Sequence, residues 1–122
     1  LVAFINCSSL KQLLIPNSVI RFDNIAFLGC YSLQQITIPN QIKKIDQWGF
    51  EGCVSLQQIT IPDSVVRIER YAFKDCTSLQ QITICNSVIW IGKEAFKSCK
   101  SLQQINIPKG SEVAFKQMLD KE

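Results

Sequence analysis

The chain has 122 residues, of which 47% are hydrophobic and 19% charged, a balance that supports one modest folded domain and not a disordered segment. Its net charge of +3 is too small for the dense basic surface of a nucleic-acid-binding protein, and no apolar stretch approaches the roughly 18 residues of a membrane-spanning helix. The absence of histidine excludes Ser-His and Cys-His catalytic pairs, histidine metal ligands and a pH switch based on imidazole.

A spacing of 23 residues organises the chain from its beginning. Phenylalanines recur at this spacing, namely Phe4, Phe27, Phe50, Phe73 and Phe96, and leucines and cysteines keep the same interval. Self-similarity at such a period is typical of a solenoid, in which each unit is one coil. The chain begins in the middle of a unit and has neither an initiator methionine nor a signal peptide, so we expect it to be a piece of a longer protein.

One unit indicates how a coil is built. Residues 33–38, with the sequence LQQITI, alternate apolar and polar side chains and predict a strand with one buried face. Pro39 ends this strand because proline supplies no hydrogen-bond donor. Ile42 and Ile45 are then expected to reach the core from a short extended segment or a turn.

The last part of the unit, residues 46–53, has Phe50 and Cys53 three residues apart, which predicts a short helical or 3₁₀ turn that faces inward. A single coil cannot bury both of its flat sides, but stacked coils can, with successive strands pairing in parallel about 4.8 Å apart. The sequence therefore predicts a right-handed α/β repeat solenoid of about five coils over residues 1–109.

The C-terminal residues 110–122 depart from the repeat and predict a capping helix over the last coil. Ser111 is a suitable N-cap. Phe115, Met118 and Leu119 form one apolar stripe at helical spacing. No comparable cap precedes the first coil, so an upstream repeat or a partner molecule is expected to cover its apolar side chains and strand edge.

Residues 30–53 carry the motif C-x-x-L-x-x-I-x-I-P-x-x-I-x-x-I-x-x-x-G-F-x-x-C. This unit resembles the BspA-like, or Treponema pallidum-type, leucine-rich repeat, which has alanine where Gly49 stands here. Two further departures are Cys85, which replaces the proline of the other units, and Gly92, which is alone in its row. The resemblance covers nearly the whole chain and implies that it is a C-terminal fragment of such a protein, folded as a leucine-rich-repeat solenoid.

Members of this family are often surface proteins that adhere to host or extracellular-matrix proteins. The resemblance therefore implies a non-enzymatic module, without a cofactor, that binds a protein partner and lies at the cell surface or is secreted. Neither nucleic-acid binding nor membrane insertion is expected. Two alternatives stay open: a cytoplasmic microbial scaffold, which unbridged cysteines favour, and a self-association element that pairs through the uncapped N-terminal coil.

The cysteines are predicted to form a structural thiol ladder and neither a metal site nor disulfides. Cysteine pairs of the C-x-x-C type, which zinc sites use, are absent. Equivalent cysteines on adjacent coils would hold their Cβ atoms about 4.8 Å apart, beyond the roughly 3.5–4.5 Å that a disulfide requires. The ladder consists of Cys7, Cys30, Cys53, Cys76 and Cys99. Cys85 lies outside it and either merely replaces proline or is exposed to oxidation and cross-linking.

Recognition requires positions at which the coils differ, and one such row carries Lys44, Arg67 and Trp90 in successive coils. Arginine and tryptophan are enriched at binding hot spots, so we predict that this row binds a partner. The alternative is a charge ladder with an acidic row two residues further along each coil, worth under about 1 kcal/mol per exposed pair. That acidic row consists of Asp23, Asp46 and Glu69.

A second variable row holds two large aromatic residues, Trp48 and Tyr71. They either pack between coils or form an exposed patch. We include both among the predicted partner-binding residues, because a patch next to the basic row would enlarge the same surface.

The outward positions of the strands are nearly invariant. Gln35, Gln58, Gln81 and Gln104 share one row, and Thr37, Thr60, Thr83 and Asn106 share another. These amides and hydroxyls either satisfy one another along the sheet or form a polar recognition face. Identical side chains on every coil carry little specificity, so the first interpretation is favoured.

Overall fold

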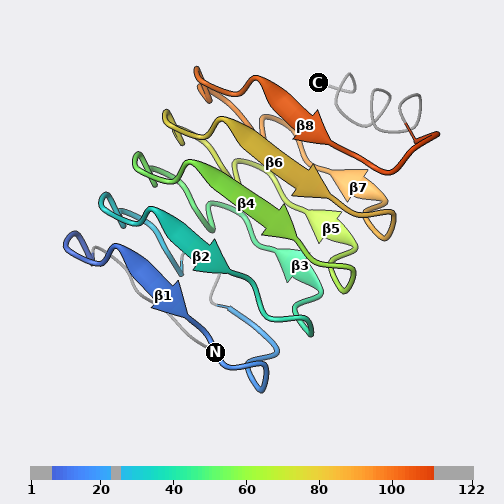
Figure 1. Cartoon of the computed structure of the whole chain (residues 1–122), viewed down its shortest axis with the longest axis horizontal. Coiled ribbons are helices and arrows are strands. Elements are labelled where there is room, and N and C mark those ends of the chain that lie inside the picture. The colour runs from blue at the N-terminus through green and yellow to red at the C-terminus, as the bar shows by residue number, and fades with distance from the viewer. Residues whose placement is uncertain (1–6, 23–25, 112–122) are drawn as a thin grey trace.

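The computed structural model describes residues 7–22 and 26–111, a stack of coils with parallel strands along two of its sides (Figure 1). The first side carries β1 (Gln12–Leu14), β2 (Gln35–Thr37), β4 (Gln58–Ile61), β6 (Gln81–Ile84) and β8 (Gln104–Asn106). The second side carries β3 (Lys44–Ile45), β5 (Arg67–Ile68) and β7 (Trp90–Ile91). On the first side, successive strands begin 23 residues apart in the sequence, so each repeat forms one coil.

All paired strands are parallel and place equivalent residues of successive coils opposite each other. On the first side Gln58 pairs with Gln81, and on the second side Arg67 pairs with both Lys44 and Trp90. This register brings every residue beside its own counterpart, which turns each sequence row into a row in space. The prediction of a parallel-strand solenoid is confirmed.

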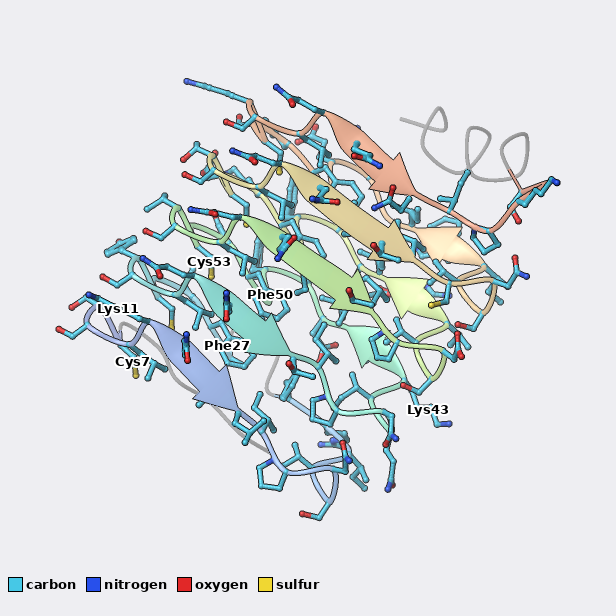
Figure 2. All side chains as sticks on the ribbon, in the orientation of Figure 1. Cys7, Lys11, Phe27, Lys43, Phe50 and Cys53 are labelled. Atoms are coloured by element: carbon cyan, nitrogen blue, oxygen red, sulfur yellow. The ribbon has the colours of Figure 1, made fainter. Side chains whose placement is uncertain are left out.

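The core consists of the inward rows of these coils. Phe27, Phe50 and Phe73 are almost fully buried, and Figure 2 shows the first two inside the stack. Their rings lie nearly parallel, with centroids 4.8 Å apart between the first two and 5.2 Å apart between the second two. Stacked aromatic pairs contribute about 0.5–1.5 kcal/mol each beyond their buried area. Among the described residues the core holds no buried polar or charged side chain, so apolar packing stabilises the stack.

The third side of the stack is built from tight turns, and the prediction of short helical turns there is wrong for the described residues. Residues 46–53 make turn hydrogen bonds such as Gly49 N to Asp46 O at 3.0 Å. The backbone φ angles of Trp48 and Gly52 are +61° and +75°, which no right-handed helix contains. The spacing of Phe50 and Cys53 suits such turns as well as a helix, and only the left-handed residues distinguish the two.

Both ends of the chain lie outside the described residues. The capping helix is predicted over residues 110–122, of which 112–122 lie outside the described residues, as does the first half-unit before Cys7. The hydroxyl of Ser111, just before that segment, is 3.0 Å from Oδ1 of Asn86 in the preceding coil. Within the described part of the chain there is no helix with the length and hydropathy that a membrane crossing requires.

Candidate functional site

The predicted thiol ladder lies inside the stack, where the thiols donate hydrogen bonds to carbonyls of the preceding coil. The sulfur-to-oxygen pairs are Cys53 with Phe27 at 3.3 Å, Cys76 with Phe50 at 3.1 Å and Cys99 with Phe73 at 3.1 Å. All six cysteines are free thiols, and Figure 2 labels two members of the ladder, Cys7 and Cys53. Each of these bonds links two coils, so the thiols act as small apolar side chains that also hold their neighbours in register.

Burial in this row raises the pKa of the thiols of Cys30, Cys53 and Cys76 above the ordinary 9.0. At Cys99, which is less deeply placed, burial raises the pKa to about 11. Since a thiolate is the reactive form of cysteine, these four thiols are protected from oxidation and alkylation at neutral pH. Reactive chemistry at these sulfurs is therefore not a function that the site supports.

We expect the free energy of unfolding to decline as the pH rises from about 9 towards 11. A raised folded-state pKa stabilises the protein fully below the unfolded pKa of 9.0, and this contribution is lost as the pH rises through the folded value of about 11 for Cys99. Urea denaturation at several pH values measures the effect. Cys99→Ala serves as the control and should decline less steeply, and equal slopes for both proteins would contradict the assignment.

The fourth thiol bond belongs to Cys85, which stands where other coils have proline. Its sulfur donates to the carbonyl oxygen of Ile61 at 3.1 Å, and the side chain is half-buried. Burial is the main cause that raises the pKa of Cys85, and a hydrogen bond with Asp63 adds to it. The thiol thus supplies an inter-coil contact that proline could not make.

The predicted basic-aromatic row lies on the outer face of the second side. Lys44, Arg67 and Trp90 occupy matching positions on β3, β5 and β7. The guanidinium carbon of Arg67 lies 5.3 Å from the centre of the Trp90 ring, a cation–π arrangement. The row therefore forms a continuous strip across three coils, which we call the stripe.

The acidic row lies beside the stripe and neutralises part of it. Nζ of Lys44 is 3.3 Å from a carboxylate oxygen of Asp46, and Nε of Arg67 is 2.6 Å from one of Glu69. The cations of these pairs are exposed and the carboxylates partly buried, and each pair stabilises the fold by about 1 kcal/mol or less. They hold the long cationic side chains in fixed positions. Charge pairing and partner binding are therefore compatible features of one surface.

The stripe has an aliphatic border, in a row that the sequence places beside the basic one. Val66 and Ile89 directly precede Arg67 and Trp90, and 38% and 73% of their surfaces are exposed. The residue before Lys44 in the same row is Lys43, which points away from the stack in Figure 2. In the sequence, β-branched residues at equivalent positions of two repeats, Val66 and Ile89, indicate this border. The stripe thus combines cations, an aromatic ring and exposed aliphatic side chains.

The predicted aromatic pair lies in the turns of the third side. The rings of Trp48 and Tyr71 are nearly parallel with centroids 6.3 Å apart, and 37% of the Trp48 surface is exposed. Both residues have φ near +60°, a conformation that costs a non-glycine residue on the order of 1 kcal/mol. The pair therefore both packs between coils and is partly exposed.

Two cations that the sequence reasoning did not single out flank this pair. The guanidinium carbon of Arg70 lies 5.2 Å from the centre of the Tyr71 ring, and Nζ of Lys74 lies 5.8 Å from it. Arg70 also donates to the Tyr71 hydroxyl at 3.3 Å. In the sequence, only their nearness to Tyr71, one residue before it and three residues after it, indicated that they could contact its ring. The stripe and the aromatic pair remain two groups, one on the second side and one in the turns that follow.

The polar rows on the first side are not a fully satisfied ladder. Among the described residues, side-chain hydrogen bonds between these rows lie at the C-terminal end, where Nδ2 of Asn106 lies 3.3 Å from both the amide oxygen of Gln81 and the hydroxyl of Thr83. A hollow of about 520 Å³ lies over β2, β4 and β6, with glutamine and threonine along its rims. The described residues hold no cluster of three or more potential metal ligands.

Comparisons with known proteins agree with this architecture. A family model described as the BspA type leucine-rich repeat region, in six copies, matches residues 2–118. A leucine-rich cell surface protein of Faecalibacterium prausnitzii is 32% identical over 93% of this chain, with a TM-score of 0.85. A leucine-rich repeat protein of Bacteroides ovatus is 36% identical over 86% of this chain, with a TM-score of 0.80.

This chain spans only 30% and 27% of the lengths of those two proteins. A leucine-rich repeat protein of T. pallidum, at 20% identity and a TM-score of 0.52, covers 92% of this chain with 78% of its own and shares the fold. No curated protein matches the chain. The family model spans nearly all of the sequence, so the chain belongs to the BspA-type leucine-rich repeat family.

Proposed function

We propose that this segment is a non-enzymatic module that binds a protein partner through the stripe. The carrying observation is that Lys44, Arg67 and Trp90 lie in register on one outer face with the exposed aliphatic side chains of Val66 and Ile89. Leucine-rich repeats present extended faces to partners, and every coil adds one residue to each row of such a face. The aromatic pair of Trp48 and Tyr71 is proposed as a second contact patch.

The stripe has the composition of a binding hot spot. Arginine and tryptophan contribute large contact areas, and the stacking of Arg67 on Trp90 reduces the side-chain freedom that binding would otherwise remove. The aliphatic neighbours supply apolar area that a partner would cover. On this face Lys43, Lys44 and Arg67 stand against Asp46 and Glu69, so the net charge of these residues is weakly positive, and a partner with a mildly acidic, partly apolar surface fits it.

We further propose that the parent protein is a surface adhesin for host or matrix proteins. The proposal is supported by the F. prausnitzii relative, which is described as a cell surface protein. The segment would then be one part of a longer adhesive solenoid. Binding of the chain to immobilised collagen, laminin and fibronectin tests the adhesive function, and failure to bind any matrix protein would count against it.

Combined replacement of Arg67 and Trp90 by alanine should weaken binding to the matrix protein that the wild-type chain binds most tightly. We expect a loss of at least tenfold, because both side chains would lose a desolvated contact. Surface plasmon resonance measures the affinity, and circular dichroism checks that the variant is folded. Gln58→Ala, on the first side of the stack, is the matched control and should bind like wild type. An unchanged affinity of the double variant would exclude the stripe.

A further inference from the structure

We propose that the first side of the stack binds an extended, uncharged polysaccharide, with one sugar unit for each coil. The site is the hollow over β2, β4 and β6 together with a second hollow of about 410 Å³ over β1 and β2. Both hollows are lined by Gln35, Ile36 and Thr37, so they lie next to each other along four coils, and we call the two together the trough. The trough lies on a different side of the stack from the stripe (Figure 1).

The lining of the trough carries no ionisable group. Its residues are glutamine, threonine, isoleucine, leucine and one proline, and the isoleucines are buried, so the exposed surface consists mainly of amides and hydroxyls and carries no charge. An acidic or basic ligand would leave its own charges without a counter-charge there. A neutral ligand rich in hydroxyl groups matches this lining, because amides and hydroxyls both donate and accept hydrogen bonds.

The side chains along most of the trough are available for a ligand. Within the described part of the chain, the amides of Gln12, Gln35 and Gln58 and the hydroxyls of Thr37 and Thr60 make no side-chain hydrogen bond. The bonds of Asn106 with Gln81 and Thr83 involve only the last coils. The favoured interpretation of the sequence, a self-satisfied ladder, therefore holds only at one end. The remaining rows present donors and acceptors to whatever occupies the trough.

The spacing of the rows favours a glycan over a polypeptide. Equivalent side chains on paired parallel strands recur about every 4.8 Å along the trough. An extended polypeptide repeats its side-chain pattern about every 6.7 Å, so it would lose register within two coils. A β-1,4-linked hexose chain is also extended, and each of its sugars advances it by about one strand spacing. Successive sugars of such a chain are flipped relative to each other, so every second sugar would meet the glutamine and threonine rows in the same orientation, two coils further along.

The uniformity of the rows supports the same choice. Glutamine occupies its row on all five strands from β1 to β8, and threonine occupies the neighbouring row on β2, β4 and β6. A protein surface does not repeat at such intervals, so identical side chains cannot discriminate among protein partners. A homopolymer presents the same groups at every unit. A row of identical side chains could therefore make the same contact with each repeat of such a ligand.

The test is titration calorimetry of the 122-residue chain with cellotetraose, xylotetraose and chitotetraose. At least one of these neutral β-1,4-linked tetrasaccharides should bind at least tenfold more tightly than its own disaccharide, because it would engage four coils and not two. Maltotetraose, which is α-1,4-linked and curved, should bind at least tenfold more weakly than that tetrasaccharide. No heat from any of the three β-linked tetrasaccharides at millimolar concentration would overturn the proposal, and so would equal binding of maltotetraose.

Variants then assign the binding to the trough. Combined replacement Gln58→Ala and Thr60→Val removes one amide and one hydroxyl from β4 and should weaken tetrasaccharide binding at least fivefold. The stripe variant with alanine at Arg67 and Trp90 should bind the sugar like wild type. Circular dichroism verifies that both are folded. Unchanged sugar affinity of the β4 variant overturns the trough as the site, whereas loss of protein binding in the stripe variant alone reports only on the proposed adhesive function.

Discussion

Phe73→Ala is expected to lower the free energy of unfolding by about 3–5 kcal/mol, the range for removing a buried phenylalanine from a core. The side chain has no exposed surface, and its ring is stacked between those of Phe50 and Phe96, with centroids 5.2 Å and 5.5 Å away. Removal would leave a cavity in the middle coil and would break the aromatic stack into two parts. Neighbouring coils cannot collapse into the gap, since backbone hydrogen bonds hold their spacing.

Urea denaturation followed by circular dichroism measures this loss. Tyr31→Ala is the matched control, because Tyr31 is also aromatic but is 54% exposed and lies outside the core. The control should change the free energy of unfolding by about 0.5 kcal/mol or less. A Phe73→Ala effect as small as that of the control would mean that the aromatic stack does not hold the coils together.

Gly92→Ala should destabilise the protein by about 2–3 kcal/mol, because the added methyl group would collide with backbone of the preceding coil. A Cβ atom at this position would lie 2.5 Å from the nitrogen of Arg70 and 2.8 Å from the carbonyl carbon of Glu69. The approach is close because the amide of Gly92 donates to the carbonyl of Ile68 at 2.7 Å. Backbone atoms cannot swing aside, so the coils would have to separate.

Gly49→Ala is the control for this prediction and should change the free energy of unfolding by only about 0.5 kcal/mol. Its Cβ would lie 3.1 Å from the carbonyl oxygen of Asp46, a tight contact but not a collision, and other coils have alanine at this position. Thermal denaturation of both variants under one condition compares them. Equal destabilisation by the two replacements would show that general glycine effects, and not the contact between coils, set the result.

Much of the fold could be predicted from the sequence, because every coil repeats the apolar pattern of one unit. The alternation in LQQITI determines which side chains face the core, and Ile59 and Ile82 are buried as that pattern requires. The turn after β3 could not be assigned, since a spacing of three between Phe50 and Cys53 suits both a helix and successive tight turns. Gly52, with φ of +75°, was the local sign of the turns.

The candidate site was predictable only in part. Row position was sufficient to bring Lys44, Arg67 and Trp90 together, because parallel strands in register preserve rows. The sequence did not predict which polar side chains of the first side hydrogen-bond to one another. These bonds involve Asn106 at one end of the rows and follow from side-chain directions. Arg70 and Lys74 were missed for a similar reason, since their contacts with Tyr71 follow from side-chain directions and not from spacing.

The strict period also determines how such a protein can change in length. Strand pairing joins each residue to its counterpart one coil away. Recombination between two of its own repeats would therefore add or remove whole coils, and each product would keep the same cross-section, core and register. Loss or gain of a single residue within a strand would instead break the register of that coil with its neighbours and turn inward side chains outward there. Copy number is thus a quantity that this architecture can vary freely, and the trough and the stripe would lengthen or shorten with it.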